Sequence, residues 1–290
     1  LSSLFDNKDF IVSYELFPPK TEKGEKSLYR HVEKLMAFKP DFITCTYGAG
    51  GSTRDRTLGI VSEVKKRFGV PVASHLTVVG STVDELRGYL RAVQERGVDY
   101  IVALRGDPPH GEETFTRTEG GLSYANELVS LIRSEFPQFG IAVAGYPEVH
   151  REAPDADTDL LNLKRKVDCG ADIIVTQLFY DNDDFFRFHD RCREAGIDAP
   201  IVPGLLPVTS LKQIQRIASL CGARLPEKFV ERLGEKDDPE WQFEVGVEQA
   251  IEQTRELIER GVCGLHFYVL NKSDATSRIL ESIQLPRPAV

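Results

Sequence analysis

Short apolar runs rich in β-branched and aromatic residues recur along the chain, separated by polar stretches. Most of the runs are almost continuously hydrophobic rather than alternating, which is typical of strands buried on both faces of a parallel sheet. The pattern predicts eight strands, over residues 11–17, 42–47, 70–77, 100–104, 141–145, 173–178, 201–206 and 265–270.

Amphipathic helical patterns lie between the predicted strands. Apolar residues over 83–93 recur at spacings of three and four, which places them on one stripe of a helix. Thr82, with Glu85 three residues later, predicts the start of this helix, and Gly97 predicts its end. The same glycine pattern predicts three more helix ends, at Gly170, Gly196 and Gly261. Residues 235–239 predict a polar loop, and a long last-but-one helix is predicted after it, over residues 241–260.

Eight strands alternating with helices in 290 residues predict a single (β/α)8 TIM barrel over residues 1–290. The structural alternative is a doubly wound open sheet, which usually has a glycine-rich turn after its first strand. Here the first strand is followed by Phe17-Pro18-Pro19-Lys20, without a G-x-G-x-x-G pattern. The sequence therefore favours the barrel.

Composition adds limits to this fold. The 41% hydrophobic and 28% charged content is ordinary for a globular protein, and the net charge of −9 disfavours a general nucleic-acid binder. No apolar run approaches the roughly 18 residues of a membrane span, and the first residues do not resemble a signal peptide. The five cysteines lack C-x-x-C spacing and the six histidines lack metal-ligand spacing, so we expect a cytoplasmic protein without a metal site.

Charge is concentrated in the turn after the fourth predicted strand. Arg105, Gly106 and Asp107 are followed by two prolines, which remove N–H donors, and Gly106 permits unusual backbone angles. In a parallel barrel the carboxyl ends of the strands hold the active site. The turn therefore predicts either a functional site or a solvated ion pair at the surface.

Other predicted strands also end in polar residues. Glu15 lies in the apolar first strand, where it is either an acid/base or one half of a buried pair. Burial among aromatic residues would raise its pKa toward that of a general acid; alternatively it caps a neighbouring loop. His75 and Gln177 end the third and sixth strands, and each is a candidate ligand or a satisfied structural residue. The glycine-rich stretch 46–52 is a weak signal for a phosphate site. The stretch 145–150 combines an aromatic ring, an acid and an imidazole, which suggests a pocket that binds a ring.

The helix after the fifth strand has a polar face. Spacings of three and four bring Asp159, Asn162 and Lys166 together, with Arg165 beside them. Such a face can bind ribose hydroxyls and a pyrophosphate, although a solvated surface is the alternative. With the polar strand ends, and without a Ser-His-Asp order, this inventory favours a redox cofactor with a planar ring and a diphosphate over hydrolysis.

Two other functions remain possible from the residues alone. A cofactor-free barrel lyase or isomerase acting on a phosphorylated molecule would bind phosphate at the last two strand ends. The stretch 203–207, PGLLP, lacks the glycine-rich pattern that this requires. A binding scaffold would leave the polar strand ends without a purpose.

Nine motifs in order over almost the whole chain carry a family resemblance. They are YELFPP at 14–19, TYGA at 46–49, HLT at 75–77, ALRGD at 103–107, YPEVH at 146–150, LLNLKRK at 160–166, TQLF at 176–179, PGLLPV at 203–208 and HFY at 266–268. By these motifs the chain resembles the 5,10-methylenetetrahydrofolate reductase family in its short bacterial form.

The resemblance implies a barrel that binds FAD non-covalently. NADH or NADPH reduces the flavin and leaves, and the folate then accepts a hydride at the same flavin face, which gives 5-methyltetrahydrofolate for methionine synthesis. This is a ping-pong scheme, and the sequence does not distinguish the two nicotinamides. The expected assembly is a cytoplasmic homo-oligomer, a dimer or a tetramer, without nucleic-acid or membrane partners.

The resemblance also assigns residues. Glu15 matches the general acid that helps open the folate ring, and Asp107 matches a carboxylate near the flavin that also holds the pterin. Gln177 matches an amide that contacts pterin and nicotinamide, and Thr46 matches a nicotinamide contact. The implied flavin contacts are Thr46, Tyr47, Ala49, His75, Arg105, Gly106, Asp107, Tyr124, Ala125, Tyr146, His150, Ala153, Asp159, Asn162, Arg165 and Lys166.

Further folate contacts are implied at Gln213 and Tyr268, and two positions depart from the family pattern. A folate-stacking Phe of some members aligns with Ile217, which cannot stack in that way. A basic residue that is Arg in some members is Lys272 here, which can pair with a folate carboxylate but not in a bidentate geometry.

Overall fold

The computed structural model describes residues 1, 4–5, 10–47, 54–108 and 114–286. Its strands form one nine-stranded parallel sheet in the order β7-β6-β5-β4-β3-β2-β1-β9-β8. Their bounds are β1 Ile11–Leu16, β2 Phe42–Cys45, β3 Val72–Thr77, β4 Tyr100–Leu104, β5 Gly140–Gly145, β6 Ile173–Thr176, β7 Ile201–Val202, β8 Gly204–Leu205 and β9 Gly264–Tyr268.

The sheet closes into a barrel through β7 and β8. β7 pairs with β6 and β8 pairs with β9, while only Pro203 separates β7 from β8 along the chain. Proline has no N–H to give to the ladder, so the predicted strand 201–206 is divided into two short strands. The barrel prediction is confirmed, and the open sheet is excluded.

The other predicted strands are confirmed with small shifts at their ends. The predicted strand 42–47 ends at Cys45, and the predicted strand 173–178 ends at Thr176. In both cases the next residue, Thr46 or Gln177, still donates its backbone N–H to the neighbouring strand. Both residues line the barrel mouth.

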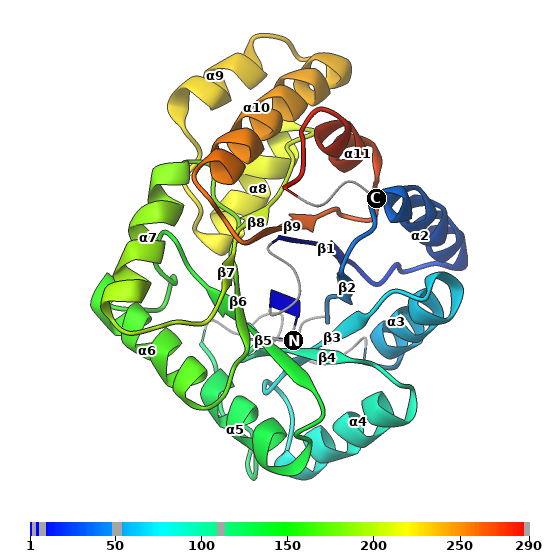
Figure 1. Ribbon diagram of the computed structural model, residues 1–290, viewed down its shortest axis with the longest axis vertical. Coiled ribbons are helices and arrows are strands. Elements are labelled where there is room, and N and C mark those ends of the chain that lie inside the picture. Colours follow the sequence, from blue (N-terminus) through cyan, green and yellow to red (C-terminus); the bar gives the residue numbers. More distant parts are fainter. Residues whose placement is uncertain (2–3, 6–9, 48–53, 109–113, 287–290) are drawn as a thin grey trace.

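Helices surround the barrel as an outer ring (Figure 1). Thr82 and Glu85 form the predicted capping box of α4, and Gly97 has a φ of 66° just beyond its end. Gly170, Gly196 and Gly261 also have positive φ at helix ends. The bounds are α2 Glu22–Leu35, α3 Arg54–Phe68, α4 Val83–Glu95, α5 Ala125–Glu135, α6 Ala156–Asp168, α7 Asn182–Glu194, α8 Leu211–Cys221, α9 Glu227–Gly234, α10 Pro239–Glu259 and α11 Asp274–Glu281, with a 3-10 turn, η1, at Met36–Phe38.

The barrel interior has an apolar layer and a polar layer. The apolar layer comes from the amino ends of the strands and includes Ile11, Phe42 and Ile173. Because side chains alternate along a strand, the same inner face continues from Ile11 to Ser13 and Glu15. The lower barrel is therefore filled by a packed core, while its carboxyl-end half is left to polar groups.

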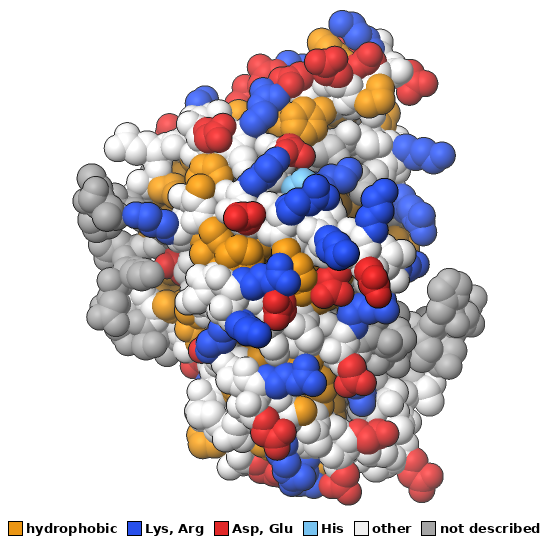
Figure 2. Space-filling view, turned by 90° about the vertical axis from the view of Figure 1, so that its right-hand side faces the viewer, with side chains coloured by type: hydrophobic (Ala, Val, Ile, Leu, Met, Phe, Trp, Pro, Cys, Tyr) orange, Lys and Arg blue, Asp and Glu red, His pale blue; other side chains and the backbone are white. Residues whose placement is uncertain are grey.

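The outer surface is that of a solvated ring of helices. Lys and Arg side chains are interspersed with Asp and Glu on the face seen in Figure 2. No helix of the described residues is both long and apolar enough to cross a membrane.

Candidate active site

Three connected cavities open at the carboxyl ends of the strands. A central cavity of about 380 Å³ and a second cavity of about 630 Å³ share five lining residues, Leu104, Arg105, Ala144, Tyr146 and His150. A third cavity of about 230 Å³ shares Tyr268 with the central one. The combined space is large enough for an extended ligand that has a ring at one end.

Glu15 lies in the central cavity between two imidazoles. Its Oε2 is 3.1 Å from Nε2 of His75 and 3.5 Å from Nε2 of His266. The other ring nitrogen of His266, Nδ1, is 2.7 Å from the hydroxyl of Ser13. Strand register explains the cluster, because β9 places His266 opposite Ser13 and Tyr268 opposite Glu15.

The electrostatics of Glu15 differ from the expectation of a raised pKa. Burial alone raises the pKa of this carboxyl, but the imidazoles of His75 and His266 stabilise the carboxylate and hold its pKa at about 2. The prediction of a raised pKa was wrong because it followed from the apolar neighbours along β1. The alternative of one half of a buried pair agrees with the two imidazoles. Glu15 is therefore ionised at neutral pH before a ligand binds, and it must gain a proton before it can donate one.

Several buried polar atoms in this layer have no hydrogen-bond partner among the described residues. They include the hydroxyls of Thr44 and Thr46, which line the central cavity. The Nε2 atoms of His75 and His266 are instead paired with the carboxylate of Glu15. Because buried polar groups are normally paired, the two hydroxyls indicate a cavity that is built to hold a polar ligand.

The turn after β4 forms one wall of the central cavity. Gly106 has a φ of 89°, and a Cβ there would lie 2.6 Å from Cγ1 of Val79, so both backbone angle and space require glycine. Arg105 makes a bidentate ion pair with Glu152, at 2.6 and 2.5 Å. Asp107 follows with an exposed carboxylate that lines the cavity. This wall therefore places a cation and an anion side by side at the mouth.

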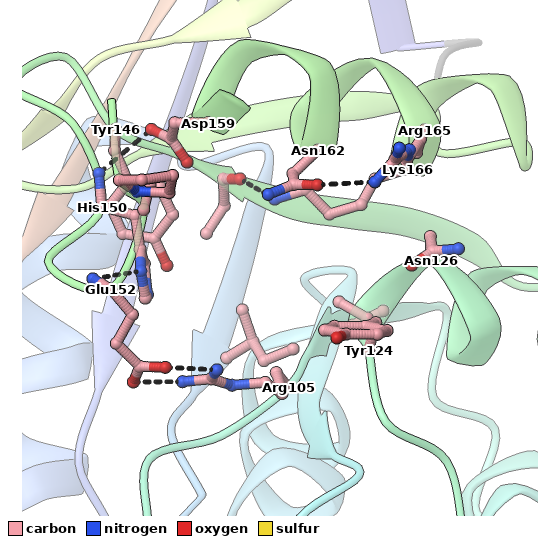
Figure 3. A pocket seen from close by; sticks show the side chains of 16 residues that line it. Arg105, Tyr124, Asn126, Tyr146, His150, Glu152, Asp159, Asn162, Arg165 and Lys166 are labelled. Carbon is pink, nitrogen blue, oxygen red and sulfur yellow. Dashed lines mark hydrogen bonds and ion pairs between the residues drawn. The ribbon is translucent and has the colours of Figure 1, made fainter. Parts of the chain in front are cut away.

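The second cavity lies between α6 and the Arg105 wall (Figure 3). The rings of Tyr146 and His150 meet edge to face at 4.6 Å, and the carboxylate of Asp159 accepts the His150 backbone N–H at 3.1 Å. Asn162 and Lys166 follow Asp159 on the same face of α6. The polar face thus lines a cavity, and Asn162 and Arg165 on it are also exposed to solvent.

Lys166 is the most buried cation of this cavity. Its ammonium group donates to the carbonyl oxygen of Ala144 at 2.5 Å. Burial lowers the pKa of Lys166 to about 8, and the neighbouring Asp159 opposes the shift. A bound anion would favour the charged form of Lys166, so the ammonium group is well placed to bind a phosphate group.

The third cavity brings together the more distant predicted contacts. Gln213 from α8 and Lys272, which follows β9, line it with Tyr268. The hydroxyl of Tyr268 donates to the carbonyl oxygen of Thr176 at 2.6 Å, and burial raises its pKa. Ile217 packs against the apolar cluster beneath α8.

The structure gathers nearly all the residues singled out in the sequence. Residues around the central cavity include Glu15, Thr46, Tyr47, His75, Arg105, Gly106, Asp107, Tyr146, His150, Gln177 and Tyr268. Those around the second cavity include Tyr124, Ala125, Ala153, Asp159, Asn162, Arg165 and Lys166. Ala49 and the glycine-rich residues 48–52 lie outside the described residues.

Some lining residues escaped the sequence analysis. His266 and Thr44 line the central cavity, and Asn126 and Glu152 line the second one. The two-residue alternation with Tyr268 could have pointed to His266. The pairing of Glu152 with Arg105 had no comparable indication, because it joins two loops 47 residues apart.

Comparison with known proteins identifies the family. The family model described as methylenetetrahydrofolate reductase matches residues 1–284. The chain belongs to the methylenetetrahydrofolate reductase family. The reaction of this family is the reduction of methylenetetrahydrofolate to methyltetrahydrofolate, and the chain is an oxidoreductase of that kind.

Relatives of two lengths are similar to the chain. The 5,10-methylenetetrahydrofolate reductase of Escherichia coli is 42% identical over 273 residues, which cover 94% of this chain and 90% of that protein. Methylenetetrahydrofolate reductase (NADH) 1 of Arabidopsis thaliana is 39% identical over 98% of this chain, but the chain spans about half of the plant protein. The match in length is thus to the bacterial methylenetetrahydrofolate reductases.

Solved structures of low sequence identity share the fold. An uncharacterised protein from Clostridium thermocellum that binds two copies of 5-methyl-5,6,7,8-tetrahydrofolic acid has a TM-score of 0.66 and 16% identity, with 97% of this chain and 96% of that chain covered. A dihydropteroate synthase from Coxiella burnetii, in complex with pteroic acid, has a TM-score of 0.52 and 12% identity, with 95% and 92% covered. These two likenesses support the barrel of this methylenetetrahydrofolate reductase family member.

Proposed function

We propose that the chain reduces 5,10-methylenetetrahydrofolate to 5-methyltetrahydrofolate by a ping-pong scheme, with FAD bound in the central and second cavities and NADH or NADPH as the reductant. The observation that carries the proposal is the continuity of these two cavities. The central cavity, with the unpaired buried hydroxyls of Thr44 and Thr46 and the carboxylate of Glu15, shares one wall with the second cavity, which is lined by cations.

The residues present fit a flavin dinucleotide. The unpaired hydroxyls of Thr44 and Thr46 suit a planar polar ring in the central cavity. Lys166 and Arg165 suit the diphosphate, because cations on a rigid helix bind phosphate oxygens by charge-assisted hydrogen bonds. When bound, the flavin supplies the two-electron chemistry that passes a hydride from nicotinamide to folate.

The protein's own groups divide the remaining work. Glu15 would supply the proton to a pterin bound in the central cavity, and the imidazoles of His75 and His266 lie beside its carboxylate. The amide of Gln177 can donate to one heterocycle atom and accept from another, so it suits pterin and nicotinamide in turn. Asp107 would accept hydrogen bonds from the pterin's N–H groups and stabilise positive charge near N5.

The third cavity suits the rest of the folate. It is apolar along Leu206, Phe243 and Leu270, which favours a benzoyl ring, and it has Gln213 and Lys272 for a carboxylate. The Clostridium thermocellum protein, which binds 5-methyl-5,6,7,8-tetrahydrofolic acid, supports a barrel of this shape as a folate binder.

The name of the plant relative supports NADH as a reductant, while NADPH remains the alternative. We also propose a cytoplasmic homo-oligomer, a dimer or a tetramer.

The visible spectrum tests the cofactor. Purified protein, or protein reconstituted with FAD, is expected to be yellow with flavin absorption bands, and one FAD should bind per chain. The double variant Arg165→Ala, Lys166→Ala tests the site of the diphosphate. It removes two cations from the second cavity and should retain less FAD than wild type. Wild-type protein that stays colourless after incubation with FAD would contradict the proposal.

A pH dependence of FAD binding follows from Lys166. Because its pKa is about 8, the ammonium group is charged below that pH and neutral above it. The dissociation constant for FAD is therefore expected to rise by up to about tenfold between pH 7 and pH 9, as the charge is lost. Lys166→Met should bind FAD more weakly at pH 7 and show little pH dependence.

Flavin fluorescence during titration at each pH measures this effect. Lys164→Met is the matched control, since Lys164 lies on the same helix but pairs with Asp168 at 3.1 Å. This control should behave as wild type. An affinity of the wild-type protein that stays constant from pH 7 to pH 9 would remove Lys166 from the diphosphate site.

A further inference from the structure

Helix α8 is held to the barrel by apolar contacts along one face. Its buried residues are Ile214 and Ala218. Ile214 belongs to the cluster containing Phe229 and Leu233, and three further residues of the helix pack against that cluster, namely Leu211, Ile217 and Cys221. Since α8 also presents Gln213 to the third cavity, its position affects the shape of the proposed folate site. Polar contacts at its carboxyl end add to this apolar attachment.

The carboxyl end of α8 is tied to the loop that follows β5. The backbone N–H of Arg224 donates to the carboxylate of Glu148, with N···Oε distances of 3.0 and 3.1 Å. Arg151, from the same loop, donates through Nη1 to the carbonyl oxygen of Leu220 at 2.5 Å. Two residues of one loop thus hold the last turn of α8 and the residues just beyond it.

The loop that holds α8 also lines the proposed cofactor site. Val149 has a φ of 82°, an unusual backbone for a β-branched residue, and it reverses the chain between Glu148 and His150. As a result Glu148 reaches the end of α8, while His150 and Tyr146 line the central and second cavities. The short turn over residues 146–150 therefore contacts the end of α8 and also lines the central and second cavities.

The guanidinium group of Arg224 adds a second attachment. Its Nη2 lies 2.8 Å from Asp184 and 3.2 Å from Asp181, at the start of α7. Burial raises the pKa of Glu148, the Arg224 amide opposes this, and Asp184 raises it again. A neutral amide side chain at position 148 would suit these surroundings, because it could still accept from Arg224 and could donate to Asp184.

We propose that Glu148 is a positioning residue that holds α8, and with it Gln213, at the barrel mouth by accepting the Arg224 amide. The loop that contacts the cofactor thereby also sets the affinity for folate. The identity of the ligand rests on the proposed function, whereas the attachment of α8 is a property of the fold. The contact acts mainly through the hydrogen bonds that Glu148 accepts, beside a longer ion pair of 3.7 Å between Nε of Arg224 and Oε1 of Glu148.

Three variants separate these effects. Glu148→Ala removes the acceptor and should raise the KM for methylenetetrahydrofolate by about five- to tenfold, with flavin content and the rate of flavin reduction by NAD(P)H within twofold of wild type. Glu148→Gln should restore most of the folate affinity, because its amide oxygen still accepts. Glu227→Ala, an exposed carboxylate at the start of α9, is the matched control and should behave as wild type.

Hydrogen exchange provides a readout that does not depend on activity. In Glu148→Ala, without added folate, peptides over residues 211–224 are expected to exchange faster, while peptides of α10 keep their protection. Arg224→Ala keeps the backbone donor and should give a smaller increase in the same peptides. If all variants prove inactive but 211–224 exchanges faster, the proposed function fails and the attachment stands.

Three results would overturn the inference itself. The first is unchanged exchange over 211–224 in Glu148→Ala, together with an unchanged KM in active enzyme. The second is an equal loss in Glu148→Ala and Glu148→Gln, since it would show that charge and not the accepted hydrogen bond matters. An equal loss of flavin reduction and folate reduction would also contradict a role confined to α8.

Discussion

Glu15→Gln is expected to reduce its flavin with NAD(P)H nearly as fast as wild type, yet to lose folate reduction by roughly a thousandfold. General acid catalysis typically contributes about 10² to 10⁴ in rate, and Gln has no proton to give at this position. Nicotinamide oxidation needs no proton from Glu15, because the hydride leaves directly. The two half-reactions should therefore separate completely in this variant.

Stopped-flow spectroscopy without oxygen measures each half-reaction of Glu15→Gln. Flavin absorbance falls when NAD(P)H is added and returns when methylenetetrahydrofolate is added to the reduced enzyme. Glu33→Gln, an exposed carboxylate on α2, is the matched control and should resemble wild type in both steps. Equal losses in the two half-reactions would refute the assignment of Glu15 as the acid.

The ionised state of Glu15 before ligand binding bears on this mechanism. Its pKa of about 2 arises from His75 and His266, so the carboxylate contributes stability above its ordinary pKa of 4.5 that is lost as the pH falls toward 2. For catalysis a proton must come to Glu15, and the imidazoles within 3.5 Å are the nearest groups that can hold one. Once Glu15 has given this proton to the opening folate ring, it is again a carboxylate, which is its stable form at neutral pH.

Asp107→Asn is expected to retain FAD and to slow folate reduction by about 10- to 100-fold. The substitution keeps the size of the side chain but replaces a carboxylate by an amide, which places an N–H₂ donor opposite the pterin's own donors. It also removes the negative charge that stabilises a cationic folate. Flavin reduction by NAD(P)H should change less than folate reduction, because the nicotinamide lacks the pterin's donor pattern.

Single-turnover rates with saturating folate and the FAD content of the purified protein test this prediction. Glu119→Gln changes another carboxylate on the connection between β4 and α5, and should leave both unchanged. Asp107→Asn with wild-type folate turnover would exclude Asp107 from the mechanism. Loss of FAD from Asp107→Asn would instead give Asp107 a role in holding the cofactor.

Local sequence patterns were sufficient to predict the barrel and most of its site. Continuous apolar runs locate parallel strands, and the residues after each run must meet at one end of a closed sheet. Glu15, Asp107 and Gln177 were found in this way although they come from three different strands. The polar face of α6 followed from helical spacing alone.

Contacts between distant segments were not predictable in the same way. The electrostatics of Glu15 depend on His266, which the fold brings beside Ser13 across 253 residues. The apolar neighbours of Glu15 in sequence suggested a raised pKa, whereas its neighbours in space lower it. The break at Pro203 also depends on context, since the same apolar run would form one strand without the missing N–H.

The central claim is that reductant and folate use the same cavity in turn, through one flavin. The most direct test is an anaerobic titration of the FAD-loaded protein, first with NAD(P)H alone and then with methylenetetrahydrofolate. We expect the flavin bands to bleach completely without folate and to return as one equivalent of folate is reduced per flavin. Bleaching that requires both compounds together, or bands that do not return with folate, would contradict the account.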